Sequence, residues 1–257
     1  MADLPLKSEK KAAAGGISGT TGAANRNASS TGASASPRSA IGNATAAKSK
    51  RALSALDKRL RIIKPIVFLA GLYPLLRLFF LGFTNGLTAN PVQFITYSTG
   101  TWCLVILCVT LAVTPLRRLT GANWLIRLRR MIGLFAFFYA LLHFITYIWF
   151  DQWFNVPAII HDVWQRPFIL VGFVAFVLLL VLALTSPKAA VRKLGRNWQT
   201  LHRAIYLAAG LALLHFWWMK AGKNDLFEPK IYIGVVAVLL AFRVVWSVVE
   251  AGKKRGA

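Results

Sequence analysis

The sequence predicts an all-α membrane protein with six transmembrane helices. Of its 257 residues, 56% are hydrophobic, and the apolar residues come in long runs rather than at amphipathic spacing. A hydrocarbon core roughly 30 Å thick is crossed by about 20 apolar helical residues, and six stretches meet that length. Basic residues gather in alternate connecting segments, which is the pattern of a polytopic membrane protein.

The six predicted spans form one domain over residues 56–250, between two tails. Residues 1–55 are rich in Ala, Ser and Gly and bury too little apolar surface to offset chain entropy, so we expect a disordered cytoplasmic tail. Residues 251–257 form a short basic cytoplasmic tail. The spans cover residues 62–81, 97–114, 131–150, 168–185, 200–219 and 230–249.

The charge distribution predicts the orientation. The chain has 31 Lys and Arg against 8 Asp and Glu, and nucleic acid would be the usual partner of a soluble chain this basic. Here the positive-inside rule accounts for the excess. Arg166 is the only basic residue in segments 82–96 and 151–167, while the alternate segments are strongly basic. Both termini are therefore expected in the cytoplasm. We expect the protein to contact the lipid bilayer and to have no nucleic-acid partner.

Two histidines lie at similar depth in parallel spans. His143 falls in the outer half of span three and His215 in the outer half of span five. An ionisable side chain at membrane depth usually faces the bundle interior, and neutral imidazole is an axial ligand of haem iron. We predict that the pair clamps a haem. The alternatives are histidines that hydrogen-bond across helices and a proton relay or transporter site, although no intramembrane carboxylate accompanies the pair.

A third histidine, His202, lies near the inner end of span five, roughly 20 Å from His215. The two are about 140° apart around an ideal helix, so they share one interface only if the helix is distorted, for which Gly210 is a candidate. Across from His202 the sequence offers Arg129 at the inner end of span three. An inner haem would need an unusual ligand or water there, and a single haem is the alternative.

Several other residues also suggest specific roles. Arg77, toward the outer end of span one, either pairs with a haem propionate or extends to the interface. Cys103 and Cys108, about 140° apart on one helix, are interpreted as buried apolar residues that form no bridge. The outer segment 151–167, with Asp162, is a candidate docking face for a partner outside the membrane.

Ordered motifs across five spans resemble one known family. They are "NPVQFITYSTGTW", "LAVTPLRRLTG", "LRRMIGLFAFFYALLHFITY", "RPFILVGFVAF", "WQTLHRAIYLAA" and "LLHFWW". Together they resemble the MsrQ (formerly YedZ) family, the haem-binding membrane subunits of the bacterial periplasmic methionine sulfoxide reductase system. The resemblance covers residues 60–245 and extends more distantly to the ferric reductase and NADPH oxidase transmembrane domain, a haem-binding bundle.

The resemblance implies a cofactor, partners and ligands. It implies haem b, one or two per chain, in the bacterial inner membrane, with electrons passed to MsrP, a periplasmic molybdenum-cofactor subunit that reduces methionine sulfoxide in oxidised proteins. Quinol or a cytoplasmic flavin reductase would be the donor, and the family has been linked to FMN. His143 and His215 carry over as the axial pair, and His202 as ligand of a second haem. The wider class has a histidine near Arg129 that this chain lacks, which leaves the haem number open.

Two other functions remain as alternatives. One is a stand-alone transmembrane ferric reductase, which needs a nicotinamide and flavin module; no G-x-G-x-x-G motif marks one here. The other is a transporter or structural membrane protein without haem. On the leading interpretation, the chain is an electron-transfer subunit of an oxidoreductase complex, and no residue of it is assigned a catalytic role.

Overall fold

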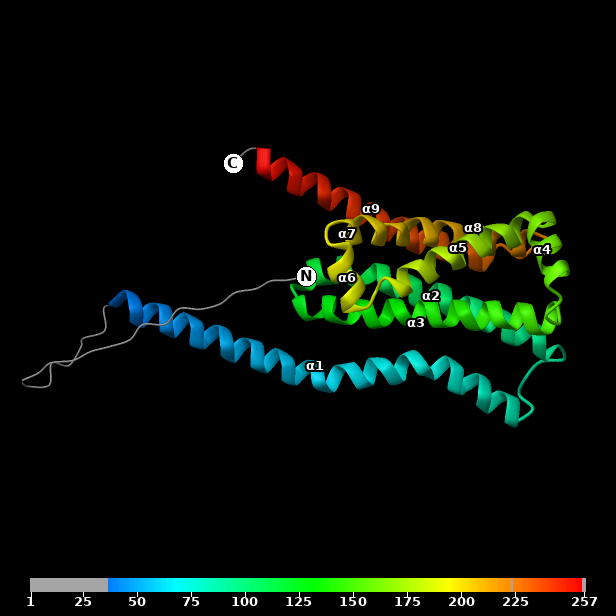
Figure 1. The fold of residues 1–257 in the computed structure, drawn as a ribbon, viewed down its shortest axis with the longest axis horizontal. Helices are drawn as coiled ribbons and strands as arrows, with labels where there is room; N and C mark the ends of the chain where they lie inside the picture. Colours follow the sequence, from blue (N-terminus) through cyan, green and yellow to red (C-terminus); the bar gives the residue numbers. More distant parts are fainter. Residues whose placement is uncertain (1–36, 223, 256–257) are drawn as a thin grey trace, which may run out of the picture. The chain divides into compact units, whose positions relative to one another are not determined.

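The computed structural model describes the backbone of residues 37–222 and 224–255 and the side chains of residues 57–222 and 224–253. The chain divides into two units, Met1–Ser49 and Lys50–Ala257. Within the first unit, residues 37–49 are helical and begin α1. The remaining helices all belong to the second unit (Figure 1).

All regular structure in the described ranges is helical, and the six predicted spans are confirmed. Six helical segments are long and apolar enough to cross a membrane: Asp57–Phe83, Pro91–Thr120, Asn123–Asp151, Pro167–Leu184, Asn197–Ala221 and Phe227–Lys253. The chain is therefore a multi-pass membrane protein. The helices are α1 (Pro37–Phe83), α2 (Pro91–Thr120), α3 (Ile126–Thr146), α4 (Val156–Gln165), α5 (Pro167–Leu184), α6 (Lys188–Leu194), α7 (Asn197–His202), α8 (Ala204–Ala221) and α9 (Phe227–Arg255), with short turns at Asn123–Leu125 and Tyr147–Asp151.

Several helices extend beyond the predicted boundaries. Helix α1 begins at Pro37, so residues 37–55 differ from the disordered tail expected there. This stretch is rich in Ala and also carries Lys and Arg, which are strong helix formers even without an apolar stripe. Helix α9 likewise continues to Arg255, into the predicted basic tail. Residues 1–36 of the predicted tail lie outside the described residues.

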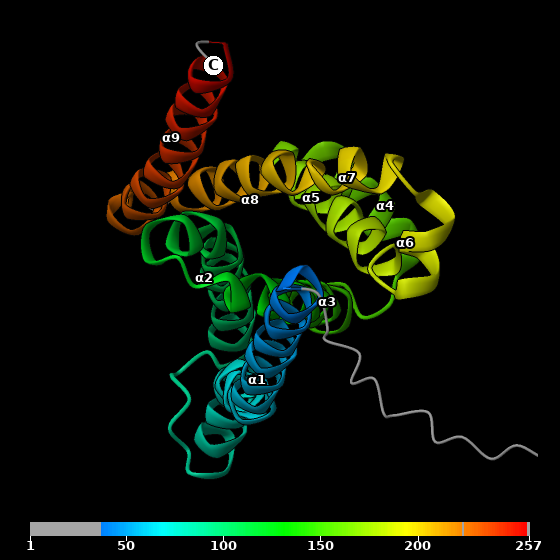
Figure 2. The ribbon, with the colours of Figure 1, turned by 90° about the vertical axis from the view of Figure 1, so that its left-hand side faces the viewer.

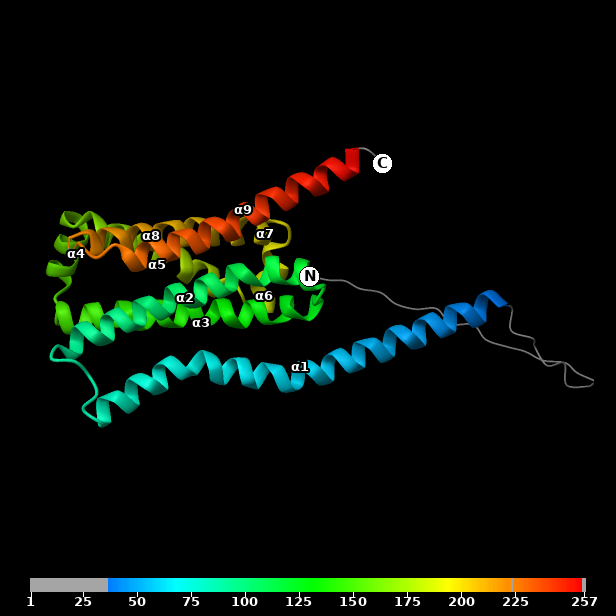
Figure 3. The same cartoon turned by 180° about the vertical axis from the view of Figure 1, so that it is seen from behind.

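Four helices form a ring that carries the rest of the bundle. Helix α2 packs against α3, α3 against α5, α5 against α8, and α8 against α2, and α9 packs outside against α2 and α8. The view in Figure 2 shows this arrangement nearly end-on, and Figure 3 shows α9 alongside α2 and α8. Neighbours in the ring are antiparallel, so the parallel helices α3 and α8 lie diagonally opposite one another.

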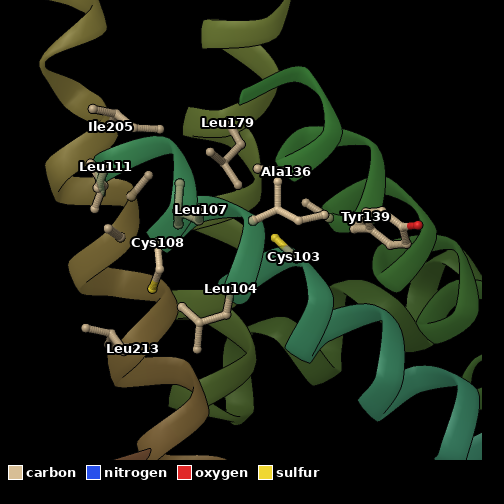
Figure 4. Packing of buried hydrophobic residues seen from close by; sticks show 14 of the residues in the cluster. Cys103, Leu104, Leu107, Cys108, Leu111, Ala136, Tyr139, Leu179, Ile205 and Leu213 are labelled. Atoms are coloured by element: carbon tan, nitrogen blue, oxygen red, sulfur yellow. The ribbon is translucent and has the colours of Figure 1, made fainter. Parts of the chain in front are cut away.

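The ring closes around small and aliphatic side chains. Leu107, Ala136 and Ala208 are 0% exposed, and alanines at these crossings let helix backbones approach closely, as small residues do in membrane bundles. Figure 4 shows Cys103 and Cys108 within this cluster on α2. Both cysteines are buried and free, as the sequence predicted.

The outermost helices present apolar surface outward. In the most apolar stretch of α2, 56% is buried, whereas only 11% and 6% of the corresponding stretches of α1 and α9 are buried. Phe80 on α1 and Val238 on α9 are 66% and 68% exposed. So much exposed apolar surface would promote aggregation in water, and it is the expected lipid face of a membrane bundle.

Helix α1 is fastened to α3 by one phenol. Tyr139 is 0% exposed, and its hydroxyl donates to the Gly71 carbonyl at 2.9 Å and accepts from the Leu75 N–H at 3.1 Å. In a regular α-helix these two groups would bond to each other. The hydroxyl therefore inserts into the backbone ladder of α1, and the ring of Phe135 occupies the space where a Gly71 Cβ would stand, 2.7 Å away.

We predict that Tyr139→Phe destabilises the protein by about 1 kcal/mol, because two backbone groups held apart in an apolar environment lose their shared partner. The measurement is thermal unfolding in detergent micelles. Tyr73→Phe is the matched control, since Tyr73 lies on α1 and is 57% exposed. Equal melting temperatures for the two variants would contradict the inserted hydroxyl.

Candidate functional site

His143 on α3 and His215 on α8 face each other across the ring. Their ring centroids are 6.2 Å apart and their planes are inclined at 73°. The structure thus brings together the two histidines that the sequence paired by depth alone. The diagonal placement of α3 and α8 is what allows the side chains to meet inside the bundle rather than at a helix–helix contact.

Each imidazole is held by a backbone carbonyl of the helix beside it. His143 Nδ1 lies 2.9 Å from the Thr96 carbonyl oxygen on α2, and His215 Nδ1 lies 2.7 Å from the Phe168 carbonyl oxygen on α5. A carbonyl only accepts, so both Nδ1 atoms carry the proton and donate it. The tautomer is thereby fixed, and each Nε2 keeps a lone pair that can bind a metal.

Both rings occupy space that exists because a neighbour is glycine. A Cβ added at Gly100 would lie 3.1 Å from the His143 ring, and one added at Gly172 would lie 2.7 Å from the His215 ring. Sequence reasoning missed both glycines and both carbonyls. The glycines are visible in the sequence, but nothing marks them until the position of each imidazole is known.

The separation of the rings suits two axial ligands on one iron. With a metal–nitrogen bond of about 2 Å and about 1.1 Å from nitrogen to ring centre, two coaxial imidazoles stand roughly 6.2 Å apart between centroids. Within the described side chains, no group of three or more His, Cys, Asp or Glu could hold a metal ion. Two protein ligands do not complete a zinc tetrahedron, whereas haem iron needs only axial ligands from the protein.

His202 lies apart from this pair, at the end of α7. Its ring stacks on Trp198 with centroids 4.0 Å apart, and its Nδ1 lies 3.2 Å from the Trp198 carbonyl oxygen. Its Nε2 is buried without a hydrogen-bond partner among the described residues. Arg129 lies within electrostatic range of the ring.

The helical break between His202 and His215 is not where the sequence placed it. Gly210, proposed as the distortion, lies inside continuous α8. The break is at Arg203, whose N–H donates to the Thr200 carbonyl at 3.1 Å while its own carbonyl accepts from Tyr206 N–H at 3.1 Å. These three-residue steps tighten the chain into a 3₁₀-like turn, so the two histidines lie on separate helices.

The arginines take different surroundings. Arg77 is exposed on α1, so its pairing with a haem propionate stays a prediction. Arg129 is partly buried on α3. Arg243 on α9 is also partly buried, with its guanidinium 4.9 Å above the Tyr206 ring.

Asp162, in the segment 151–167, is buried and makes several contacts. Asp162 on α4 is only 8% exposed and accepts hydrogen bonds from the Tyr147 hydroxyl at 2.8 Å and the Gln152 amide at 3.1 Å. Arg166 Nε completes its partners at 2.8 Å. Asp162 therefore ties α4 to the end of span three and is not available to a partner, although His161 beside it is exposed.

Comparison with known proteins agrees with this architecture. Residues 99–213 match the family described as "Ferric reductase like transmembrane component". A Bordetella pertussis protein named "Protein-methionine-sulfoxide reductase heme-binding subunit MsrQ" is 57% identical over 195 residues, 76% of this chain and 93% of that protein. Proteins of the same name from Herminiimonas arsenicoxydans, 56% identical over 74% of this chain and 87% of theirs, and from Xanthomonas campestris pv. campestris, 48% identical over 65% and 76%, also match.

No solved structure shows significant similarity to the chain. The family resemblance predicted from the ordered motifs is confirmed by the curated relatives, which this chain covers over most of their length. The chain belongs to the family of protein-methionine-sulfoxide reductase heme-binding subunits, MsrQ.

Proposed function

We propose that this protein holds haem b between His143 and His215 and relays electrons across the bacterial inner membrane to MsrP, a periplasmic, molybdenum-dependent methionine sulfoxide reductase that repairs oxidised proteins. The observation that carries the proposal is the facing pair of imidazoles, 6.2 Å apart, each with its Nδ1 on a carbonyl. The names of the relatives, which describe heme-binding subunits of such a reductase, support it.

The residues around the site favour electron transfer over substrate chemistry. Haem supplies one-electron exchange between ferric and ferrous iron. With His143 and His215 both holding it, the haem would supply electron exchange rather than bind a substrate. The Nδ1–H donors to the Thr96 and Phe168 carbonyls raise the basicity of the ligating nitrogens and hold the rings in place. Phe144, stacked on Phe176 with centroids 4.4 Å apart, adds apolar surface beside His143.

The proposed path begins at the basic side of the membrane. Quinol or a cytoplasmic flavin reductase is the proposed donor, and FMN a proposed additional cofactor; both come from the family resemblance. A second haem ligated by His202 would lie nearer that side. Its support is the buried Nε2 of His202, which has no hydrogen-bond partner in the described part of the chain.

We predict that His143→Ala and His215→Ala each abolish the b-type signal of their site in reduced-minus-oxidised absorption spectra, because each removes one of two axial ligands. Haem content per chain is measured in parallel on the purified protein. His161→Ala, in the exposed outer segment, is the control and keeps the wild-type spectrum. Full haem retention in both His143→Ala and His215→Ala would exclude the axial pair. A colourless wild-type protein would favour the transporter or structural alternative.

The second site has its own test. We predict that His202→Ala lowers the haem content by half while the spectrum of the His143–His215 site persists, because the two sites use different ligands. Trp198→Phe keeps an aromatic ring for stacking and serves as the control for packing around His202. Unchanged haem per chain in His202→Ala would show that His202 ligates no haem.

The orientation predicts a labelling pattern. Cysteines introduced at Gln165 and Ala189, both exposed, lie in the segments before and after α5, at opposite ends of that span. In intact cells stripped of their outer membrane, an impermeant maleimide is expected to label Gln165→Cys and to reach Ala189→Cys only after permeabilisation. Buried Cys103 and Cys108 give the low background. The reverse pattern would contradict cytoplasmic termini.

A further inference from the structure

We propose that the site consists of two copies of one carbonyl–glycine–histidine unit, in which Gly100 and Gly172 are positioning residues that set the orientation of the histidines. In each unit a helix carbonyl accepts from the imidazole, and a glycine one turn later makes room for the ring. This inference rests on the proposed haem site and deepens it, because it states what holds the two ligands in place.

The two units have the same spacing along the chain. Thr96 and His143 are 47 residues apart, and Phe168 and His215 are also 47 residues apart. In both units the glycine follows the carbonyl residue by one helical turn, and both histidines stand in the same run of letters, "ALLHF". The units are built on the packed pairs α2 with α3 and α5 with α8.

Helix geometry explains why the position one turn after the carbonyl has to be glycine. Every Cα–Cβ bond of an α-helix tilts toward the N-terminus, so a side chain lies over the turn that precedes it. A Cβ at position 100 or 172 would therefore lie beside the carbonyl that the imidazole must reach. The distances agree, since these Cβ atoms would stand 3.1 Å and 2.7 Å from the histidine rings.

The other glycines of the ring helices have no such neighbour. Each of the four helices carries one glycine. A Cβ at Gly133 on α3 would meet only the Thr110 methyl at an ordinary 3.6 Å, and a Cβ at Gly210 on α8 would meet nothing within 4 Å. The close contacts thus occur on the two helices that supply carbonyls, not on the two that supply histidines.

Displacing a ring would change the ligand electronically as well as sterically. The Nδ1–H···O bond increases electron donation from the ligating nitrogen, which stabilises the ferric form. If an added methyl group pushes the ring away and weakens this bond, the midpoint potential rises. The two rings are inclined at 73°, and a bound haem iron would sense this inclination, so a change in it would alter the anisotropy of the low-spin ferric electron paramagnetic resonance signal.

The test compares Gly100→Ala and Gly172→Ala with the control variants Gly133→Ala and Gly210→Ala in the purified holoprotein. Haem transfer to excess apomyoglobin, the midpoint potential and the low-spin signal are measured for all four. We expect haem to leave Gly172→Ala roughly 10–100-fold faster than the wild type and Gly100→Ala less markedly faster, since its contact is less tight. Both are expected to show raised potentials and altered signals, while the controls match the wild type.

The possible failures are distinguishable. If the wild type and the controls bind haem and the two test variants match them, the positioning units are excluded while the proposed function stands. A test variant that releases haem faster with an unmoved potential and signal has merely looser packing, and this result too overturns the positioning role. If the wild type holds no haem, the proposed function itself fails.

Discussion

The site depends on one hydrogen bond made twice, from imidazole Nδ1–H to a helix carbonyl. A polar ring inside a lipid-embedded bundle has no water to satisfy it, and an unsatisfied donor there is costly. The carbonyl satisfies that donor, fixes the tautomer and leaves the opposite nitrogen free. It also requires the carbonyl helix and the histidine helix to pack closely, and the ring of α2, α3, α5 and α8 provides both close pairs.

Contacts of side chains with the backbone of another helix recur elsewhere in the bundle. Tyr139 inserts its hydroxyl into the ladder of α1, and Trp198 donates its indole N–H to the Thr185 carbonyl at the end of α5 at 3.0 Å. Lipid gives helices little hydrophobic reason to associate, so packing and interhelical hydrogen bonds must hold them. The acceptor of Trp198 lies at a helix end, and a glycine makes room for each imidazole.

The sequence was sufficient for features that depend on length and depth. Six apolar runs predicted six spans, and the positions of His143 and His215 within theirs predicted that the rings would meet. The sequence was insufficient where the role of a residue depends on which side chain packs against it in the folded structure. Gly100 and Gly172 matter only because a ring lies against each, and the break at Arg203 follows from local hydrogen bonding that no glycine announces. Asp162 looked like a surface carboxylate because two of its three partners, Tyr147 and Gln152, precede α4 and come from the end of span three and the turn after it.

The repetition of the two units bears on how a flat molecule is recognised. Thr96 with His143 and Phe168 with His215 present the same chemistry from opposite sides, so the ligands themselves cannot tell one face of a macrocycle from the other. Any preference between the two flipped orientations would have to come from unlike surroundings, and the residues that follow the two histidines do differ: Phe144 stacks on Phe176, whereas Phe216 meets Tyr232 edge-on. The two histidine units would therefore set how tightly the macrocycle is held, while the residues around them would set which way it faces.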